Sequence, residues 1–322
     1  MRVLVTGGAG FIGHHVVDLL LRDGHTVVSL DRLDFSGNLN RLAELERPPA
    51  RSAFRIVHHD LKAAINPLLA NQIGPVDWIL HLAAASHVDR SIDDPLSFVM
   101  DNVVGTCNAL TFARDTKARF LYFSTDEVFG PAPSGVRYKE WDRYRSGNPY
   151  AASKAGGEEL AVAFANTYKM HVVVTHTMNV IGRRQHPEKY LPSTIRKVRD
   201  GEEVLIHADS MCTHPGSRFY IDASEVARAV LFLMRKGQSG EKYNIVGERE
   251  MDNLELAQRI ARAVGKPLKH RLVNFHSSRP GHDLRYALDG AKLDEMGFER
   301  QTPIEKGINQ VVDWTMNNPQ WL

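Results

Sequence analysis

Two adjacent carboxylates follow a run of apolar residues that is typical of a buried strand. The predicted strand covers Phe120–Ser124, and Thr125, Asp126 and Glu127 come directly after it. One carboxyl group kept protonated beside one kept ionised is a suitable acid and base pair for an elimination. Taken alone, acidic residues at a strand end more often cap a turn or a helix. Their position relative to other reactive groups must decide between these interpretations.

A second reactive pair is formed by Tyr150 and Lys154, which are separated by one helical turn at the start of a predicted helix. This spacing places the phenol and the ammonium group on one face of the helix. The lysine charge lowers the pKa of the phenol, so that a phenolate can remove a proton from an alcohol. As an isolated match, the same spacing is also compatible with a core tyrosine beside a solvated lysine.

A glycine-rich turn joins the first predicted strand, Arg2–Thr6, to the first predicted helix, Phe11–Arg22. It contains Gly7, Gly10 and Gly13 at regular intervals. This spacing lets backbone amides and a helix N-terminus approach a pyrophosphate. A glycine turn that only packs a helix against a sheet is the alternative.

The second predicted strand ends at Asp31. A carboxylate at this position can accept hydrogen bonds from an adenosine ribose, and it repels a 2′-phosphate. The strand, the glycine turn, the helix and Asp31 together predict a dinucleotide site that holds NAD rather than NADP.

Short β-branched runs alternate with amphipathic stretches up to about residue 180, the pattern of βαβ units that wind a parallel sheet. The predicted strands are Arg2–Thr6, Thr26–Asp31, Phe54–His58, Trp78–Leu82, Phe120–Ser124 and Val172–Thr177. The predicted helices are Phe11–Arg22, Asp94–Arg114, Ala151–Tyr168, Ile221–Met234 and Leu254–Val264. The sequence therefore predicts an α/β fold, with a Rossmann-type doubly wound parallel sheet whose carboxyl edge carries the site.

After about residue 180 the pattern is less regular, with Pro and Gly clusters at Gln185–Pro192, His214–Gly216 and Arg279–Gly281. We expect residues 1–178, together with about 219–246, to form an NAD-binding domain. Residues 179–218 and 247–322 are expected to form a smaller C-terminal substrate-binding lobe.

Composition excludes several functional classes. With 40 Lys and Arg against 38 Asp and Glu, the chain lacks the basic block of a nucleic-acid-binding protein. Two cysteines are too few for a disulfide framework or a cysteine-based zinc site, which favours a reducing compartment. No apolar run has membrane-spanning length, so a cytoplasmic protein without a membrane partner is expected. His58 and His59 point to opposite faces of a strand, so no metal site is predicted.

The same motifs resemble those of the extended short-chain dehydrogenases/reductases, and within them the dTDP-glucose 4,6-dehydratases. The resemblance covers most of the chain. Beyond the glycine-rich turn and the Tyr150–Lys154 pair, it is carried by the segments Asp31–Leu39, Leu82–Ser91, Thr125–Glu127, His186–Lys189 and Arg279–Tyr286. The Thr-Asp-Glu triplet is the most diagnostic, because related epimerases carry a small residue at one of the two acidic positions and related decarboxylases have Ser-Glu.

The resemblance implies a nucleoside-diphosphate hexose as substrate, with dTDP-glucose first among the candidates, and a 4-keto-6-deoxy product. Tyr150, assisted by Lys154 and Thr125, would deprotonate the hydroxyl at carbon 4 while NAD⁺ accepts hydride. Glu127 would then remove the proton at carbon 5, and Asp126 would protonate the departing hydroxyl at carbon 6. NADH would return the hydride to carbon 6. This cycle of oxidation, water elimination and re-reduction is that of a hydro-lyase.

The resemblance also assigns binding roles. The residues implied for the cofactor are Gly7, Gly10, Phe11, Ile12, Gly13, Asp31, Arg32, Leu33, Asp60, Leu61, Leu82, Ala83, Ala85, Asp101, Tyr150 and Lys154. Those implied for the substrate are Ser86, Thr125, Asn179, Glu188, Lys189, Arg218, Asn253, Arg279 and His282. Two departures concern this set: Arg218 is displaced by about two positions from the arginine usual in the family, and Ala85 stands where an acidic residue is common.

Two other functions use the same features. An epimerase or decarboxylase of nucleotide sugars would have the same cofactor site and the same Tyr150–Lys154 pair. A non-catalytic NAD-binding scaffold would share the fold, because fold alone does not establish activity. Asp126 and Glu127 favour the dehydratase over both. The family commonly forms homodimers through the helices of the Asp94–Arg114 and Ala151–Tyr168 segments, so a homodimer is expected.

Overall fold

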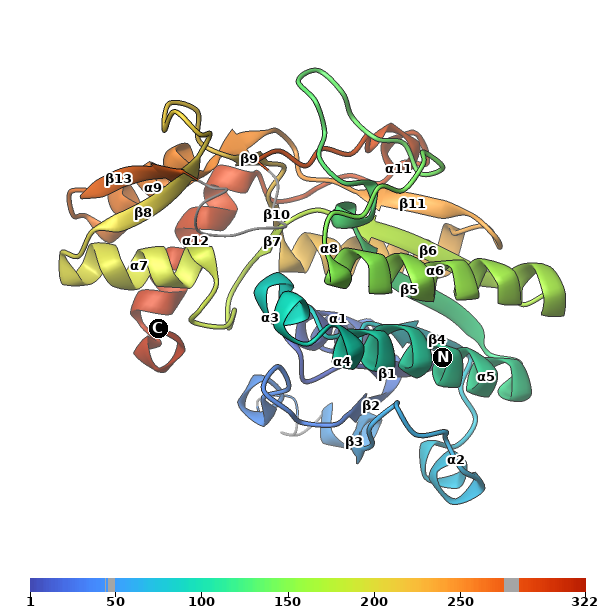
Figure 1. Ribbon diagram of the computed structural model, residues 1–322. Helices are drawn as coiled ribbons and strands as arrows, with labels where there is room; N and C mark the ends of the chain where they lie inside the picture. Colours follow the sequence, from blue (N-terminus) through green and yellow to red (C-terminus); the bar gives the residue numbers. More distant parts are fainter. Residues whose placement is uncertain (44, 46–49, 275–283) are drawn as a thin grey trace.

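The centre of the protein is a seven-stranded parallel sheet. The computed structural model describes residues 1–43, 45, 50–274 and 284–322, and Figure 1 shows their arrangement. The strand order is β11-β6-β5-β4-β1-β2-β3, and every neighbouring pair in it is parallel. The strands are β1 (Arg2–Thr6), β2 (Thr26–Asp31), β3 (Phe54–His58), β4 (Trp78–His81), β5 (Arg119–Thr125), β6 (Val172–Thr177) and β11 (Lys242–Ile245). The predicted doubly wound α/β fold is confirmed.

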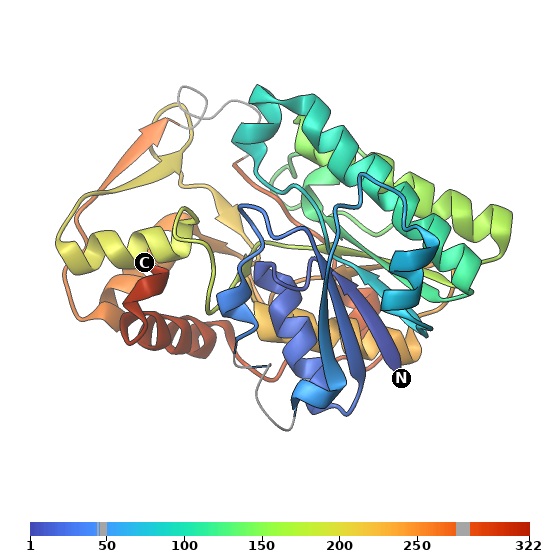
Figure 2. The ribbon, with the colours of Figure 1, turned by 90° about the horizontal axis from the view of Figure 1, so that it is seen from below.

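Helices cover both faces of the sheet, as Figures 1 and 2 show. On one face α1 (Phe11–Arg22) packs against α8 (Ala223–Lys236), and on the other α5 (Gly105–Thr116) packs against α6 (Pro149–Tyr168). Each face has its own apolar core, one around Val5 and the other around Tyr122. Strands buried on both faces read as continuous apolar, β-branched runs. For this reason the predicted strands agree with the observed ones to within one residue at each end.

The helix predicted over Asp94–Arg114 is not a regular α-helix throughout. Pro95 begins α4 (Pro95–Val99), which Asp94 caps by accepting a hydrogen bond from the Ser97 amide. A π-helical turn, η3 (Met100–Val104), then leads into α5. The predicted helix is confirmed from Pro95 onward, but the apolar periodicity gave no sign of the π-helical turn, in which only the backbone hydrogen-bond pattern changes.

A second prediction needs a smaller correction. The segment predicted as a helix from Ile221 begins with the short strand β10 (Ile221–Asp222). The Asp222 side chain then accepts a hydrogen bond from the Ser224 amide and caps α8, as an aspartate at this position commonly does.

A smaller lobe lies beside the carboxyl edge of the sheet, at the left of Figure 1. Its helices α7 (Tyr190–Asp200), α9 (Asn253–Val264) and α12 (Ile304–Met316) pack together around a third apolar core. Strand β8 (Val204–Ala208) pairs in parallel with β13 (His270–Asn274). Two further two-stranded pairs connect the lobe to the sheet region: β7 (Val180–Ile181) with β10, and β9 (Ser217–Arg218) with β12 (Met251–Asp252).

The remaining elements are short. They are α2 (Pro67–Ile73), α3 (Val88–Asp93), α11 (Ala291–Glu295), η1 (Leu39–Arg41), η2 (Ala50–Ala53), η4 (Asp126–Phe129) and η5 (Pro319–Trp321). Among the described residues no helix is long and apolar enough to span a membrane. The same part of the chain contains no group of three or more side chains arranged to hold a metal ion. Cys107 and Cys212 are both free thiols.

Candidate active site

A cavity of about 840 Å³ lies between the carboxyl edge of the sheet and the smaller lobe. Most of the predicted site residues line it: Gly7, Gly10, Phe11, Ile12, Gly13, Arg32, Leu82, Ala85, Ser86, Asp101, Thr125, Asp126, Glu127, Tyr150, Lys154, Asn179, Glu188, Lys189, Arg218 and Asn253. An adjoining smaller cavity is lined by Asp31, Asp60, Leu61 and Ala83, together with Gly7, Gly10 and Arg32. The fold therefore gathers residues that are far apart in the sequence around two adjoining cavities with shared walls.

One predicted residue of the described structure lines neither cavity, and two others cannot be placed. Leu33 lines neither cavity; its backbone amide donates a hydrogen bond to Asp31, 2.8 Å away. Arg279 and His282 lie outside the described residues.

The glycine-rich turn has the shape that a pyrophosphate requires. Gly7 has a φ of +72°, and a Cβ placed on it would lie 2.8 Å from the backbone of Ala83. A Cβ on Gly13 would lie 2.1 Å from the carbonyl oxygen of Gly7. Side chains are therefore excluded at both positions, and the N-terminus of α1 opens directly onto the cavity. The turn fits a dinucleotide.

Asp31 is fixed at the end of β2. Its carboxylate accepts hydrogen bonds from the amides of Ala9, at 3.1 Å, and Leu33, at 2.8 Å. Burial raises the pKa of Asp31, and the two amide hydrogen bonds oppose that rise. The side chain is thus held rigidly beside the space where an adenosine ribose would lie.

The neighbouring cation, Arg32, is fully engaged by carboxylates. Asp101 binds its guanidinium in a bidentate pair at 2.6 and 2.8 Å, and Asp34 accepts from its Nε at 2.6 Å. Asp60 lies 3.7 Å from the same group. Asp101 and Asp34 raise the pKa of Arg32, with the Asp101 hydrogen bonds as the largest cause. An arginine held in this way is poorly placed to receive an additional phosphate.

The acidic pair is positioned by the end of β5. Thr125 accepts a hydrogen bond from the Glu127 amide at 3.4 Å and caps the short helix η4, and its hydroxyl also donates to Asp126 at 3.0 Å. Glu127 accepts a hydrogen bond from Asn148 at 3.0 Å. Asp126 is 4% exposed, and its Oδ2 has no hydrogen-bond partner in the described part of the chain. A buried carboxyl oxygen left available in this way is suited to meet a ligand.

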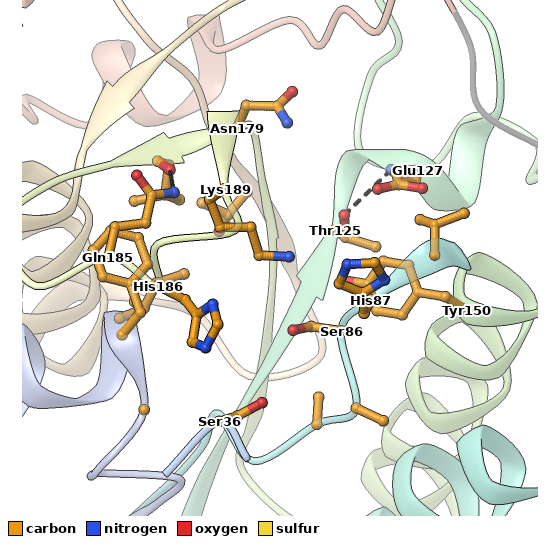
Figure 3. A pocket seen from close by; sticks show the side chains of 18 of the residues that line it. Ser36, Ser86, His87, Thr125, Glu127, Tyr150, Asn179, Gln185, His186 and Lys189 are labelled. Atoms are coloured by element: carbon orange, nitrogen blue, oxygen red, sulfur yellow. Dashed lines mark hydrogen bonds between the residues drawn. The ribbon is translucent and has the colours of Figure 1, made fainter. Parts of the chain in front are cut away.

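Tyr150 and Lys154 come from the first turns of α6. Asn148 caps this helix by accepting from the Ala151 amide at 2.8 Å, and Pro149 occupies its first turn. Tyr150 is 9% exposed and Lys154 is 3% exposed. Figure 3 shows Tyr150 on the same side of the cavity as Thr125 and Glu127. The phenol, the hydroxyl and the carboxylates therefore share one end of the cavity.

Burial controls the protonation of this end. It raises the pKa of Asp126 to about 6, against the opposing effects of the Thr125 hydrogen bond and the Arg218 charge. Burial also raises the pKa of Tyr150, as does the charge of Glu127, whereas a hydrogen bond with Thr125 lowers it. The pKa of Lys154 falls to about 7 because its charge is desolvated. A buried carboxyl group with a raised pKa retains a proton that it can donate.

The opposite wall of the cavity comes from the start of the smaller lobe. Figure 3 shows Lys189 and Asn179 across the cavity from Thr125, with Ser86 between the two walls. Glu188 lies 3.3 Å from Arg90 and 3.6 Å from His87. Polar groups from two lobes thus face each other across the space.

Arg218 and Asn253 line the far part of this wall. Arg218 donates hydrogen bonds to the carbonyl oxygens of Ser217 and Leu284, and it is close enough to Asp126 for its charge to lower the pKa of that carboxyl group. Asn253 accepts a hydrogen bond from Tyr220 at 2.5 Å. Despite its displacement in the sequence, Arg218 therefore presents its charge to the cavity.

Comparison with known proteins agrees with this arrangement. The sequence family described as GDP-mannose 4,6 dehydratase matches residues 4–311. The chain belongs to this family. A curated relative, dTDP-glucose 4,6-dehydratase of Xanthomonas campestris pv. campestris, is 38% identical over 99% of this chain and 94% of its own length.

Solved structures of the dehydratase family and of its neighbours have the same fold. A dTDP-glucose 4,6-dehydratase from Streptomyces venezuelae, solved with NAD bound, is 36% identical with a TM-score of 0.90, covering 100% of this chain and 98% of that one. A UDP-glucose 4-epimerase from Thermus thermophilus, also in complex with NAD, is 29% identical with a TM-score of 0.86, covering 97% and 98%. The fold is therefore shared by dehydratases and epimerases, and the side chains of the cavity must distinguish them.

The sequence of this dehydratase-family member did not reveal every residue of the cavity. Phe35, His87, Arg90 and His186 also line it. They form a contact between its walls: Arg90 lies 3.7 Å above the Phe35 ring, whose centre is 4.5 Å from that of His186. These residues stand in or beside the segments that carry the family resemblance, and proximity to those segments was the only available signal.

Arg41 was also missed. It lines the cavity although it is only 3% exposed, and it donates hydrogen bonds to the carbonyl oxygens of Ala9, Ser36 and Arg184. Its role is to hold the loop after β2 against the glycine-rich turn. Arg41 is a single arginine outside every motif of the sequence, so nothing in the sequence indicated this role.

The raised pKa of Asp126 predicts a pH-dependent effect on stability. Ionisation of this carboxyl group is less favourable in the folded than in the unfolded chain, so its contribution to stability is present at low pH and is lost as the pH rises through about 6. Asp126→Asn cannot ionise. The substitution changes the free energy of unfolding by different amounts at different pH values. We expect its effect to be more stabilising at pH 8 than at pH 4.5, by about 2 kcal/mol.

This prediction can be measured by urea unfolding of both proteins at the two pH values. An equal effect of the substitution at both would show that Asp126 ionises as readily in the folded protein as in the unfolded chain.

Proposed function

We propose that this protein is a nucleotide-sugar 4,6-dehydratase that converts a nucleoside-diphosphate hexose, with dTDP-glucose as the first candidate, into the 4-keto-6-deoxyhexose. The observation that carries the proposal is the meeting of Thr125, Asp126, Glu127 and Tyr150 at one end of the cavity, beside the glycine-rich turn. An alcohol oxidation alone needs a base but no carboxylate pair, whereas removal of water needs both an acid and a second base. The names of the relatives support the same reaction.

NAD is the cofactor that this site would hold. A Cβ is sterically excluded at Gly7 and Gly13, which fits the pyrophosphate of NAD, and the Asp31 carboxylate lies where it would accept hydrogen bonds from a ribose. We assign the adenine end to Asp60 and Leu61 and the remainder of the NAD site to Leu82–Ala85, Asp101, Tyr150 and Lys154, which line the two adjoining cavities. When bound, NAD supplies a temporary acceptor for the hydride of carbon 4 and returns it to carbon 6.

The side chains of the protein then handle the protons. Tyr150 takes the proton of the carbon-4 hydroxyl, with the hydrogen bond of Thr125 and the charge of Lys154 stabilising its phenolate. The ketone acidifies the proton at carbon 5, which Glu127 removes. Asp126, whose pKa of about 6 leaves it partly protonated near neutrality, protonates the hydroxyl that leaves carbon 6. Because these groups share one end of a buried cavity, each proton can pass directly between the substrate and a side chain.

The nucleotide end of the substrate is assigned to the opposite wall. We propose that Ser86 and Asn179 contact the sugar, and that Glu188, Lys189, Arg218, Asn253, Arg279 and His282 hold the diphosphate and base. The buried Oδ1 of Asn179 has no hydrogen-bond partner in the part of the chain that the structure describes, which supports a ligand contact there. Lys189 and Arg218 supply the positive charge that a diphosphate needs.

An epimerase is the second candidate, because an epimerase from Thermus thermophilus shares the fold and was solved with NAD. The two carboxyl groups argue against it. Epimerisation at carbon 4 needs only oxidation and reduction, so neither a buried acid at Asp126 nor a base at Glu127 has a task in it.

A panel of nucleotide sugars tests the function. Purified protein is incubated with dTDP-, UDP- and GDP-hexoses, and the products are identified by mass spectrometry and NMR. We expect loss of one water with a 4-keto-6-deoxy product and no net formation of NADH. An inverted hexose of unchanged mass would establish an epimerase instead, and the absence of any turnover with tightly retained NAD would indicate a scaffold.

Cofactor preference gives a further prediction. Because Asp31 repels a 2′-phosphate and Arg32 is occupied by Asp101 and Asp34, we expect NAD to bind more tightly than NADP by roughly two orders of magnitude. Asp31→Ser should reduce this preference by at least about tenfold. Calorimetric titration of the cofactor-free proteins measures both affinities. Equal affinity of the parent protein for the two cofactors would show that Arg32 leaves its aspartate partners to bind the phosphate.

We also propose a cytoplasmic homodimer, with a cofactor domain of residues 1–178 and about 219–246 and a substrate lobe of residues 179–218 and 247–322. Leu96 and Val99 on α4 are 68% and 43% exposed, which supports pairing through this helix surface. Gel filtration with light scattering should give twice the chain mass of 36.1 kDa. A monomer at all concentrations would remove the homodimer from the proposal.

A further inference from the structure

A buried charge cluster lies behind the Tyr150–Lys154 pair, outside the cavity. Its centre is Glu158, which is 0% exposed and stands one turn after Lys154 on α6. Lys242 of β11 forms an ion pair with Glu158 at 2.8 Å, and His176 of β6 lies 3.1 Å from the same carboxylate. None of the reaction steps assigned above uses these groups. A fully buried carboxylate destabilises the fold unless its charge is paired and hydrogen-bonded.

Further hydrogen bonds link the members of this cluster to one another. Tyr144, from the loop after β5, donates a hydrogen bond to Glu158 and accepts one from Lys242 at 2.7 Å. The other ring nitrogen of His176 contacts Asn244 Oδ1 at 2.9 Å. His176 and Lys242 hold the pKa of Glu158 below its ordinary value, although burial alone would raise it. Glu158 therefore remains ionised between α6 and the sheet.

The order of the strands places the charges in a line. Lys154 lies over β5 and β4. Its ammonium group is 4.4 Å from the centre of the Tyr122 ring on β5. Burial lowers the pKa of His81 on β4, and the charge of Lys154 lowers it further. Glu158 contacts β6 through His176, and Lys242 belongs to the edge strand β11. Because the sheet order is β11-β6-β5-β4, Glu158 stands between the two lysines.

Several ionisable groups lie near Lys154 on the elements packed around it. They include His81 on β4, Tyr122 on β5, and Tyr150 and Glu158 on α6, with His176, Lys242 and Tyr144 behind Glu158. On the cavity side, Asp101, Asp126 and Glu127 line the same space as Lys154. Glu158 is the charged neighbour that raises the pKa of Lys154, against the larger lowering by burial. Lys242 has the opposite sign and lies on the far side of the carboxylate.

We infer that Glu158 is a positioning residue for the proposed reaction: its carboxylate, held in place by Lys242, His176 and Tyr144, stands one helical turn from Lys154 on α6 and favours the charged form of that side chain. This rests on the proposed function. The charged lysine in turn stabilises the Tyr150 phenolate. The cluster thus acts on the proton transfer through Lys154, without touching substrate or cofactor.

Two substitutions that break the same ion pair separate this role from a structural one. Glu158→Gln removes the negative charge nearer to Lys154, and we expect the pKa of Lys154 to fall by about one unit. Lys242→Met removes the positive charge behind it, and we expect that pKa to rise. A merely structural role predicts the same change from both, because both remove one bond of one pair.

The titration is measured on the NAD-loaded protein by NMR of ε-¹³C-labelled lysine. The Lys154 resonance is the one that Lys154→Met removes. The double variant Glu158→Gln with Lys242→Met leaves no unpaired charge between these two groups. It should give a Lys154 pKa between those of the parent and Glu158→Gln, and it provides the comparison if a single variant does not fold.

The pH dependence of turnover adds a second readout. In Glu158→Gln, the fall of activity on the alkaline side, where Lys154 loses its proton, should move to lower pH by the same amount as the NMR titration. Opposite shifts for the two single variants support the inference; shifts of the same sign, or none, overturn it. If no nucleotide sugar is dehydrated, the proposed function fails, yet the NMR titration still decides whether Glu158 controls the protonation of Lys154.

Discussion

Tyr150→Phe should abolish every step of the reaction. The substituted ring fills the same space, packed edge-on against Phe98 with 6.4 Å between ring centres, but it has no hydroxyl group to receive the proton of the substrate. Thr125 and Lys154 remain in place, yet neither can replace the phenolate. Loss of the base at the first step should lower kcat by roughly four orders of magnitude, the upper end of the range for such groups.

Single-turnover absorbance measures this expectation directly. The parent protein mixed with dTDP-glucose should show transient formation of reduced nicotinamide, and Tyr150→Phe should show none. Tyr168→Phe is the matched control, because Tyr168 lies on the last turn of the same helix and is 47% exposed. It should react as the parent does. Oxidation by Tyr150→Phe at more than about a hundredth of the parent rate would assign the base to another group.

The sheet was the part of the fold that sequence could predict best. Strands such as Val172–Thr177 are buried on both faces, so their β-branched runs carry an unambiguous signal. The missed helix α7 shows the limit of this approach, because Pro192 was taken as part of a loop cluster. Pro192 lies in the first turn of α7, where its missing N–H is not needed for helical hydrogen bonding.

The π-helical turn at Met100–Val104 depends on contacts that no local pattern encodes. Asn102 in this turn hydrogen-bonds to both backbone groups of Ala85 and to the Ser153 hydroxyl. It thereby ties the loop after β4 to α6. The segment was predicted as plain helix because its apolar spacing is helical, whereas the position of Asn102 is decided by two other parts of the fold.

The candidate site could be predicted wherever chemistry and local structure coincide in a short segment. The glycine-rich turn, the Thr125–Glu127 triplet and the Tyr150–Lys154 pair are of this kind, and the structure brings them to one cavity. Glu158, His176 and Lys242 come from three separate elements, and each looks ordinary in its own segment. Only the strand order reveals that they form one charged line behind Lys154.

Asp126→Asn and Glu127→Gln should stop the reaction after oxidation. Each substitution keeps the approximate shape of the side chain and removes its capacity to donate or accept a proton. We expect both to slow elimination by roughly two to four orders of magnitude, the usual effect of losing a general acid or base. Reduced nicotinamide should then accumulate on the protein together with a 4-keto hexose that retains its carbon-6 hydroxyl.

The two variants should differ in the exchange of the carbon-5 hydrogen with solvent. In D₂O, Asp126→Asn still has Glu127 as base, so deuterium should enter carbon 5 of the trapped ketone without loss of water. Glu127→Gln should show neither exchange nor elimination, because the proton is never removed. Mass spectrometry and NMR of the quenched sugar read both outcomes, and Glu159→Gln, on the exposed side of α6, serves as the matched control.

The difference between these variants assigns the acid and the base separately. Exchange in Glu127→Gln but not in Asp126→Asn would reverse the two roles. The raised pKa of Asp126 argues against this reversal, as does its Oδ2, which has no hydrogen-bond partner among the described residues. Formation of the 6-deoxy product by both variants at near-parent rates would reduce Asp126 and Glu127 to structural groups at the end of β5. The cavity would then retain only the groups that an epimerase also needs, and the distinction between the two reactions would be lost.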